Sequence, residues 1–384
     1  MVQPLTPTQI SGYLKTSGDE LSAIHSMLQH DAELQEMANT PLLLSIMTLA
    51  FQGVSSTGLF DGSHLIRRQY LFDAYIRRMF VHRGVPVSYA ACSTMKWLRW
   101  LAFGLKEDGQ TLFLIERIQP NRFQIYNNYV SYSRIMKLIG GVVYGLVLGI
   151  MLWMMGGIVW GLVGVLSGLT IGQYSKPSFI VPVEKLVLSK IWTKEVAFVT
   201  VLFGVLMGFN ARFNTDSNLV LTLFFSIIGG LIGGSGAILS YIDKSDSITE
   251  HSTPNQGMWH SSQNMLVGSL VSAPHFGLMF GMACGVYGEL HVGFAGGLAT
   301  GLIGGLFKYG GETCLQHLVL RYLFYRYKLA PWNYARFLDY CHERLFLRKV
   351  GGGYIFIHRM LMEHFANMTD EDIERIAREV EASR

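Results

Sequence analysis

Charged residues are scarce in this chain of 384 residues: Asp, Glu, Lys and Arg make up only 15%, and half of all residues are hydrophobic. A soluble globular protein is roughly a quarter charged. The composition therefore excludes a disordered or acidic tail protein, which combines low hydrophobicity with high charge. The net charge of +4 is too small to indicate nucleic-acid binding, and no nucleic-acid partner is expected.

Cysteine is also rare, and the four cysteines are scattered over the sequence: Cys92, Cys284, Cys314 and Cys341. They form no CxxC pair and have no zinc-like spacing with histidine, which excludes a disulfide scaffold. No HExxH pattern and no Ser-His-Asp arrangement can be argued from the sequence, so no metal site and no catalytic residue are expected. The first 20 residues lack a basic stretch before an apolar core, so a signal peptide is not expected.

The shortage of charge is concentrated in the middle of the chain. Five blocks contain no Asp, Glu, Lys or Arg: residues 138–175, 196–211, 217–242, 251–288 and 290–307. The first block is long enough for two membrane passes, because one helical pass needs about 20 apolar residues. We therefore predict about six spans, at residues 138–155, 157–173, 196–211, 219–241, 265–287 and 290–307.

Lysine and arginine near these spans predict their orientation, because cytoplasmic loops are enriched in both. Arg134 and Lys137 precede the first span, four lysines lie between residues 176 and 194, and Lys244 and Lys308 follow the fourth and sixth spans. The remaining turns carry little positive charge. The spans then form three hairpins with both chain ends in the cytoplasm, so we expect a multi-pass protein of the cytoplasmic (inner) membrane whose partner is the lipid bilayer.

Glycine is abundant, with 42 residues, and within the spans it recurs every four positions. On a helix this period keeps glycines on one face, where the missing side chains allow close backbone approach in lipid. A glycine-lined pore and self-association of the chain into a homo-oligomer are two further interpretations. The glycines predicted to pack membrane helices are Gly141, Gly145, Gly149, Gly277, Gly281, Gly285, Gly293, Gly297, Gly301 and Gly305.

The two ends of the chain have ordinary charge density and are predicted to be soluble. In the first, a helix is expected to start at Pro41 with Thr40 as its N-cap. In the second, strand-like runs on both sides of Gly351–Gly353 predict a β-hairpin, followed by a helix over 359–367. A helix, a hairpin and a further helix are the closing elements of a winged-helix module.

These features predict a mainly α protein with three parts. Residues 1–130 form a helical region, residues 131–311 a glycine-rich membrane domain of about six spans, and residues 312–384 a winged-helix-like end with a charged tail. The spans contain no Asp, Glu, Lys or Arg, and only His275 is ionisable well inside one. Because ion-coupled transporters need such groups, this argues against coupled transport.

Three segments resemble the C-terminal half of a bacterial membrane-anchored NACHT protein, which is a signalling NTPase of the STAND class. They are Asn39–Met47 with its Pro-Leu-Leu-Leu motif, the helix Tyr70–Met79, and Tyr354–Ala366 with its Phe-x-His-Arg motif. The resemblance implies that Pro41 packs near an adenine base and that His358 approaches the β-phosphate of bound ADP. Both are therefore nucleotide-sensing candidates, and a role in bacterial defence or stress signalling is implied.

The phosphate-binding loop of that family, GxxxxGK[ST], is absent from this sequence. Without its lysine and backbone cradle, the chain has no ATPase site. ATP or ADP with Mg²⁺ would bind only if an upstream or separate NTPase core were supplied. We therefore expect a membrane-anchored regulatory fragment that is not catalytic alone, and the alternative is a channel or transporter built from glycine-rich hairpins.

Overall fold

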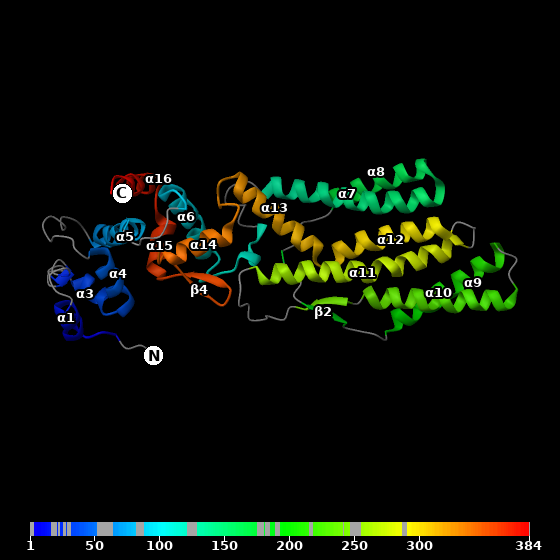
Figure 1. Ribbon diagram of the computed structural model, residues 1–384, viewed down its shortest axis with the longest axis horizontal. Coiled ribbons are helices and arrows are strands. Elements are labelled where there is room, and N and C mark those ends of the chain that lie inside the picture. The colour runs from blue at the N-terminus through cyan, green and yellow to red at the C-terminus, as the bar shows by residue number, and fades with distance from the viewer. Residues whose placement is uncertain are drawn as a thin grey trace. The chain divides into compact units, whose positions relative to one another are not determined.

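The computed structural model describes residues 4–16, 21, 24–25, 28, 32–51, 64–81, 88–120, 129–174, 180, 185–188, 193–214, 218–240, 242–245, 255–285 and 290–383. The fold is mainly helical, and the chain divides into two compact units (Figure 1). The terminal unit contains Met1–Phe113 and Tyr325–Arg384, and the central unit contains Leu114–Phe324.

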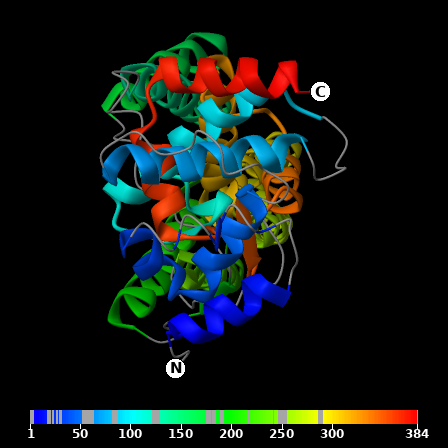
Figure 2. The ribbon, with the colours of Figure 1, turned by 90° about the vertical axis from the view of Figure 1, so that its left-hand side faces the viewer.

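The terminal unit is built from both ends of the chain, so the blue N-terminal helices and the red C-terminal helix of Figure 2 belong to one body. Thr40 precedes Pro41, which begins helix α4 (Pro41–Phe51), as the sequence predicts. Thr369 and Asp372 form a capping box at the start of helix α16 (Asp370–Ala382). The helices of the terminal unit are α1 (Pro7–Thr16), α3 (Ala32–Ala38), α4 (Pro41–Phe51), α5 (His64–Val81), α6 (Ala91–Glu107), α14 (Tyr334–Glu343), α15 (Arg359–Asn367) and α16 (Asp370–Ala382).

A three-stranded antiparallel sheet joins the two halves of the terminal unit. Strands β4 (Leu347–Val350) and β5 (Gly353–Phe356) form the expected hairpin, and Gly351 and Gly352 turn between them with φ of 48° and 73°. Positive φ at both turn positions favours glycine. The third strand, β1 (Leu112–Phe113), was not predicted, and it pairs with β5 in the order β1-β5-β4. One strand therefore precedes the central unit and two follow it.

A buried arginine fastens α5 to α14 within this unit. Arg344 is only 1% exposed, and its Nη1 donates hydrogen bonds of 2.8 Å to the carbonyl oxygens of both Met79 and Phe80. These carbonyls lie at the end of α5, where no further helical N–H groups are available to them. The guanidinium also lies 4.8 Å from the ring centre of Tyr340. The positive charge is thus stabilised by a helix C-terminus and an aromatic ring.

We expect Arg344→Met to reduce the stability of the terminal unit by about 3 kcal/mol, because two buried carbonyls lose their donor. Hydrogen exchange of peptides from α5 and α14, measured on the detergent-solubilised protein, reports this loss as faster exchange. Arg348→Met is the matched control, since Arg348 lies on an exposed position of β4. Equal effects of the two substitutions would contradict the role given to Arg344.

The central unit consists of three helix pairs followed by an exit helix (Figure 1). Helix α7 packs most extensively on α8, α9 on α10, and α11 on α12. A kink at Phe307–Gly311 separates α12 from α13, and Gly310 there has a φ of 127°. The helices are α7 (Tyr129–Gly156), α8 (Ile158–Tyr174), α9 (Lys194–Asn214), α10 (Leu219–Ser240), α11 (Gln256–Gly285), α12 (Leu290–Leu306) and α13 (Glu312–Arg326).

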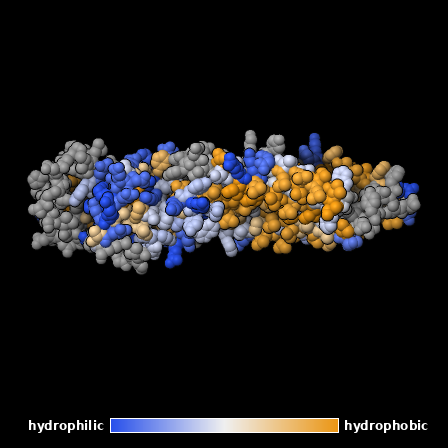
Figure 3. Space-filling view, turned by 90° about the horizontal axis from the view of Figure 1, so that it is seen from above, coloured by the Kyte–Doolittle hydropathy of each residue, from blue (hydrophilic) through white to orange (hydrophobic). Residues whose placement is uncertain are grey.

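Four segments of the central unit are long and apolar enough to cross a membrane: Val130–Trp153, Leu219–Ile238, Gln256–Met282 and Leu290–Arg326. Ile158–Gln173 is also apolar but shorter. Large hydrophobic side chains cover the outside of these helices, and Leu219 and Ile158 are each more than 70% exposed. Figure 3 shows hydrophobic residues gathered over this unit. Such an apolar exterior is typical of a membrane protein, since water would make it unfavourable.

A short ribbon closes the base of the α9–α10 pair. Strand β2 (Lys185–Leu188) lies before α9, and strand β3 (Ile242–Ser245) follows α10. The two strands pair antiparallel, with Lys185 opposite Ser245. Neither strand was predicted from the sequence, because each is short and depends on the other for its hydrogen bonds. The ribbon brings the entry to α9 and the exit from α10 to the same end of the hairpin.

Candidate functional site

The glycines of α7 and α8 bring these two helices together at backbone distance. A Cβ added to Gly141 or Gly145 would lie 3.2 or 3.1 Å from a carbonyl oxygen of α8. On α8, a Cβ at Gly168 would overlap the backbone of Gly145, and one at Gly172 would overlap Gly141. Gly149 likewise faces α8. The two helices therefore run antiparallel, with no room for side chains between them at these positions.

The predicted glycines of α11 and α12 also lie between partner helices of the same chain. A Cβ at Gly297 would overlap the carbonyl of Phe276, and one at Gly301 or Gly305 would come within 2.7 Å of a Cα atom of α11. Gly277 and Gly281 face side chains of α12 at 3.1 and 3.3 Å. Gly293 is buried on α12, and Gly285 ends α11. The structure thus places the close-packed glycines inside hairpins and not on a face offered to a second chain.

A third glycine seam, between α9 and α10, was missed by the sequence analysis. A Cβ at Gly204 would lie 2.8 Å from the carbonyl oxygen of Ser226, and one at Gly230 would lie 3.0 Å from that of Thr200. The pairs Gly204/Gly208 and Gly230/Gly234 have the four-residue spacing that could have revealed it. All three helix pairs are therefore joined by close backbone contact at glycines.

We expect Gly168→Leu to separate α7 from α8, because the leucine would overlap the backbone of Gly145. The cost of overpacking at such a contact is about 3 kcal/mol. Trp153 and Trp160 lie on these helices, so a melt followed by tryptophan fluorescence in detergent measures the change. Thr170→Leu, at an exposed position of α8, is the matched control and is expected to leave the melting temperature unchanged. A melting temperature of Gly168→Leu equal to that of the control would exclude this contact.

The two nucleotide-sensing candidates begin different helices of the terminal unit. Pro41 is exposed at the start of α4, which packs against α3 and α5. His358 is the N-cap of α15, and its Nδ1 accepts a hydrogen bond of 3.0 Å from the backbone N–H of Met360. Helix α15 packs mainly on α6 and also touches α5 and β5. The two residues are therefore held on separate helices that share α5 as a neighbour.

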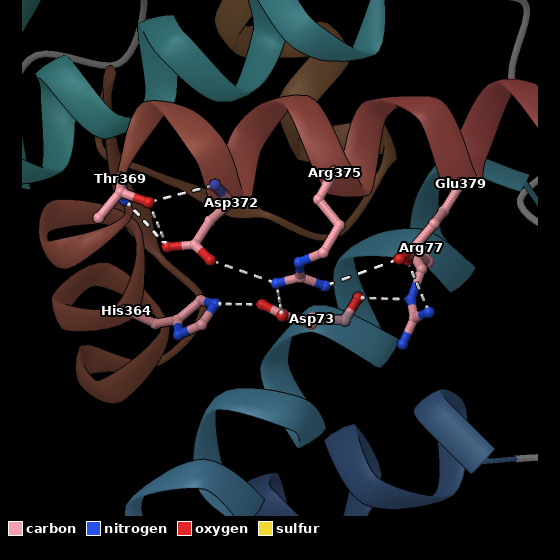
Figure 4. A network of polar contacts seen from close by, with 7 residues as sticks. All are labelled: Asp73, Arg77, His364, Thr369, Asp372, Arg375 and Glu379. Carbon is pink, nitrogen blue, oxygen red and sulfur yellow. Dashed lines mark hydrogen bonds and ion pairs between the residues drawn. The ribbon is translucent and has the colours of Figure 1, made fainter.

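A polar cluster around Asp73 joins α5, α15 and α16, and Figure 4 shows its seven residues. Asp73 is 6% exposed, and its carboxylate accepts bonds of 2.9 Å from His364 Nε2 and 2.7 Å from Arg375 Nη2. Arg77 of α5 binds Glu379 of α16 at 2.8 Å. A small cavity of about 50 Å³ lies beside Asp73 and His364. The cluster thus fastens three helices through charge-assisted hydrogen bonds.

The charges of this cluster stabilise one another. Burial acts to raise the pKa of Asp372, but hydrogen bonds from Thr369 and Arg375 outweigh it and leave this pKa below its ordinary value. The hydrogen bond to Asp73 raises the pKa of Arg375 above its ordinary value. The contacts with Arg375 therefore favour the charged forms of Asp372 and Arg375, and the cluster acts as a structural clamp. Among the described residues, no group of three His, Cys, Asp or Glu side chains is placed to hold a metal ion.

This cluster was not predicted from the sequence, although Asp73 and His364 both lie in segments that carry the NACHT resemblance. Nothing in the local pattern of either segment shows that two residues so far apart in the chain are partners. The available signal was a charged residue within an apolar stretch of the sequence. Asp73 follows Phe72 on α5, and its neighbours on both sides are buried or half-buried. A buried carboxylate needs a partner, which the sequence did not identify.

We expect Asp73→Asn to loosen α15 and α16 from α5, because Arg375 and His364 lose a buried charged acceptor. The expected loss of stability is about 2 kcal/mol. It is smaller than for a fully buried ion pair because the Arg375 side chain is 44% exposed. Hydrogen exchange in α16 peptides is the measurement. Asp370→Asn is the control, since Asp370 is 69% exposed in its contact with Arg99 and should change little. Similar exchange in the two variants would show that the clamp contributes nothing.

Comparison of the chain with protein families, with curated proteins and with solved structures returns no match. A role for this chain therefore rests on its own residues and its own fold.

Proposed function

We propose that the chain is the membrane-anchored regulatory part of a NACHT-type signalling NTPase and that it is not catalytic alone. One observation carries the proposal: strand β1 pairs with β5, in the sheet order β1-β5-β4. With α6 before β1 and α14 before β4, the element order of the terminal unit resembles that of a winged-helix module, which supports the proposal. The central unit is then an insertion into that module, between its first strand and the helix before its hairpin.

The same pairing supports an even number of membrane crossings. The chain leaves the terminal unit after Phe113 and re-enters it at Tyr325. If the terminal unit lies outside the membrane, both points must lie on the same side of it. Within the central unit, α8 runs back along α7, so a crossing by α7 requires a return by α8. Extended to the other two pairs, this supports six spans in three hairpins. The positive residues outside the spans favour the cytoplasm for both chain ends.

The capping bond of His358 supports a role in sensing phosphate. Because Nδ1 accepts the N–H of Met360, the neutral ring carries its proton on Nε2. A donor of this kind suits a phosphate oxygen. In the proposed assembly, His358 would contact the β-phosphate and Pro41 would pack near the base. ATP or ADP with Mg²⁺ would be held by an upstream or separate NTPase core, and the output would be a signal in bacterial defence.

The test compares the chain alone with the chain joined to an NTPase core encoded next to it. Alone in nanodiscs, the chain is expected not to bind labelled ADP. Joined to the core, His358→Ala is expected to speed ADP release at least tenfold, which corresponds to the loss of one charge-assisted hydrogen bond. The control is Arg359→Ala, at the neighbouring exposed residue, whose side chain contacts only Glu363 one helical turn away among the contacts that the structure describes.

Two results would contradict this function. One is ADP release that is equally fast with and without the His358 imidazole. The other is sustained ion or dye flux through liposomes that contain the chain alone, without any nucleotide, which would favour the channel or transporter.

A further inference from the structure

A groove of about 480 Å³ lies in the central unit between α7 and the α12–α13 segment. Residues of α7 between Met136 and Val147 form one wall, and residues between Ile303 and Gln316 form the other. The volume falls in the range of sites that hold a small molecule. The groove is separate from the glycine seams and from the cluster around Asp73.

Two glycines keep this groove open. Gly140 of α7 and Gly304 of α12 lie on opposite walls, and a Cβ added to either would meet no atom within 4 Å. The seam glycines on the same two helices behave differently, since a Cβ at Gly141 or Gly305 would press on a neighbouring backbone. At Gly140 and Gly304 the missing side chain therefore leaves volume for an occupant and does not serve helix contact.

The groove is apolar at one end and charged at the other. Val147 and Ile303 mark the apolar end, whereas Lys308, Glu312 and Gln316 mark the other. The charge-free part of α7 begins at residue 138, so the charged end coincides with the end of the apolar block. From Met136 to Val147 the wall of α7 measures about 16 Å at 1.5 Å per residue. This is close to half of the hydrocarbon core, which is about 30 Å thick, so the groove spans one leaflet.

The kink after α12 places a cation at the mouth of the groove. Gly310, with its φ of 127°, lets the chain turn at this point, where a Cβ would lie 2.6 Å from the carbonyl oxygen of Ser261. Tyr309 turns inward and is only 3% exposed, whereas the neighbouring Lys308 is exposed and lines the groove. Glu312 begins α13 and adds a carboxylate to the same mouth.

We propose that this groove is a binding site for one membrane phospholipid with an ammonium headgroup, of the phosphatidylethanolamine class. One acyl chain lies along α7, over the open positions of Gly140 and Gly304. Lys308 binds the phosphate, and Glu312 binds the ammonium group. The mouth thus has one charge of each sign, as this headgroup has, whereas a lipid with only a phosphate charge would leave Glu312 facing an anion. A primary ammonium group can also donate hydrogen bonds to the Glu312 carboxylate, which the quaternary ammonium of phosphatidylcholine cannot. The site requires the central unit to lie in a membrane and does not depend on the NTPase assignment.

The experiment is native mass spectrometry of the full chain, delipidated and re-equilibrated in mixed micelles that contain phosphatidylethanolamine, phosphatidylglycerol and phosphatidylcholine in equal amounts. The wild-type protein is expected to retain one phosphatidylethanolamine. Gly304→Leu fills the groove and is expected to reduce that occupancy at least tenfold. Ala295→Leu, at an exposed position of the same helix, is the matched control and should retain the lipid.

Two head-group variants separate the parts of the proposal. Lys308→Gln is expected to weaken binding of all three lipids, whereas Glu312→Gln is expected to remove only the preference for phosphatidylethanolamine. Equal occupancy in Gly304→Leu and the wild type would overturn the site, and an unchanged preference in Glu312→Gln would overturn its specificity. If Gly304→Leu melts below the control, Gly140→Leu closes the groove from the opposite wall, and retained lipid there would likewise overturn the site.

Discussion

The pairing of β1 with β5 is the constraint on which the whole architecture depends. Two residues before the central unit form hydrogen bonds with a strand that follows it, so the terminal unit is incomplete until the chain has returned. Everything between these strands must therefore begin and end at the same body. A membrane block built from helix pairs meets this requirement. The central unit has three such pairs, each joined by a glycine seam: α7 with α8, α9 with α10, and α11 with α12.

The two units are stabilised by different physical means, as their different surroundings require. In the central unit, apolar surface faces outward, so the hydrophobic effect does not favour one helix contact over another. Close backbone contact at the glycines supplies the dispersion energy instead. In the terminal unit, an ordinary apolar core excludes water, and a few buried charges then specify how helices meet. Two such charges are Arg344, which follows α14 and binds the end of α5, and Asp73 of α5, which binds α15 and α16.

The sequence allowed the helices to be located because their signals are local. Charge-free blocks and four-residue glycine spacing mark the helices of the central unit, and two adjacent glycines mark the turn between β4 and β5. Strand β1 could not be found in the same way, since Leu112 and Phe113 are too few to show any period and become a strand only by pairing with β5. The partners of Asp73 were also hidden, because His364 and Arg375 approach it only in the folded chain.

The self-contained seam of each helix pair has a consequence for how such a protein can change over time. A pair that buries its own glycines and returns to its starting side can be added or removed without altering the side on which the chain emerges. In the proposed arrangement of six spans a single helix cannot, since its loss would leave β1 and β5 on opposite faces of the bilayer. The helix pair is therefore the smallest piece that duplication or deletion could exchange here, and the length of the membrane block could vary among descendants while the body that surrounds it stays the same.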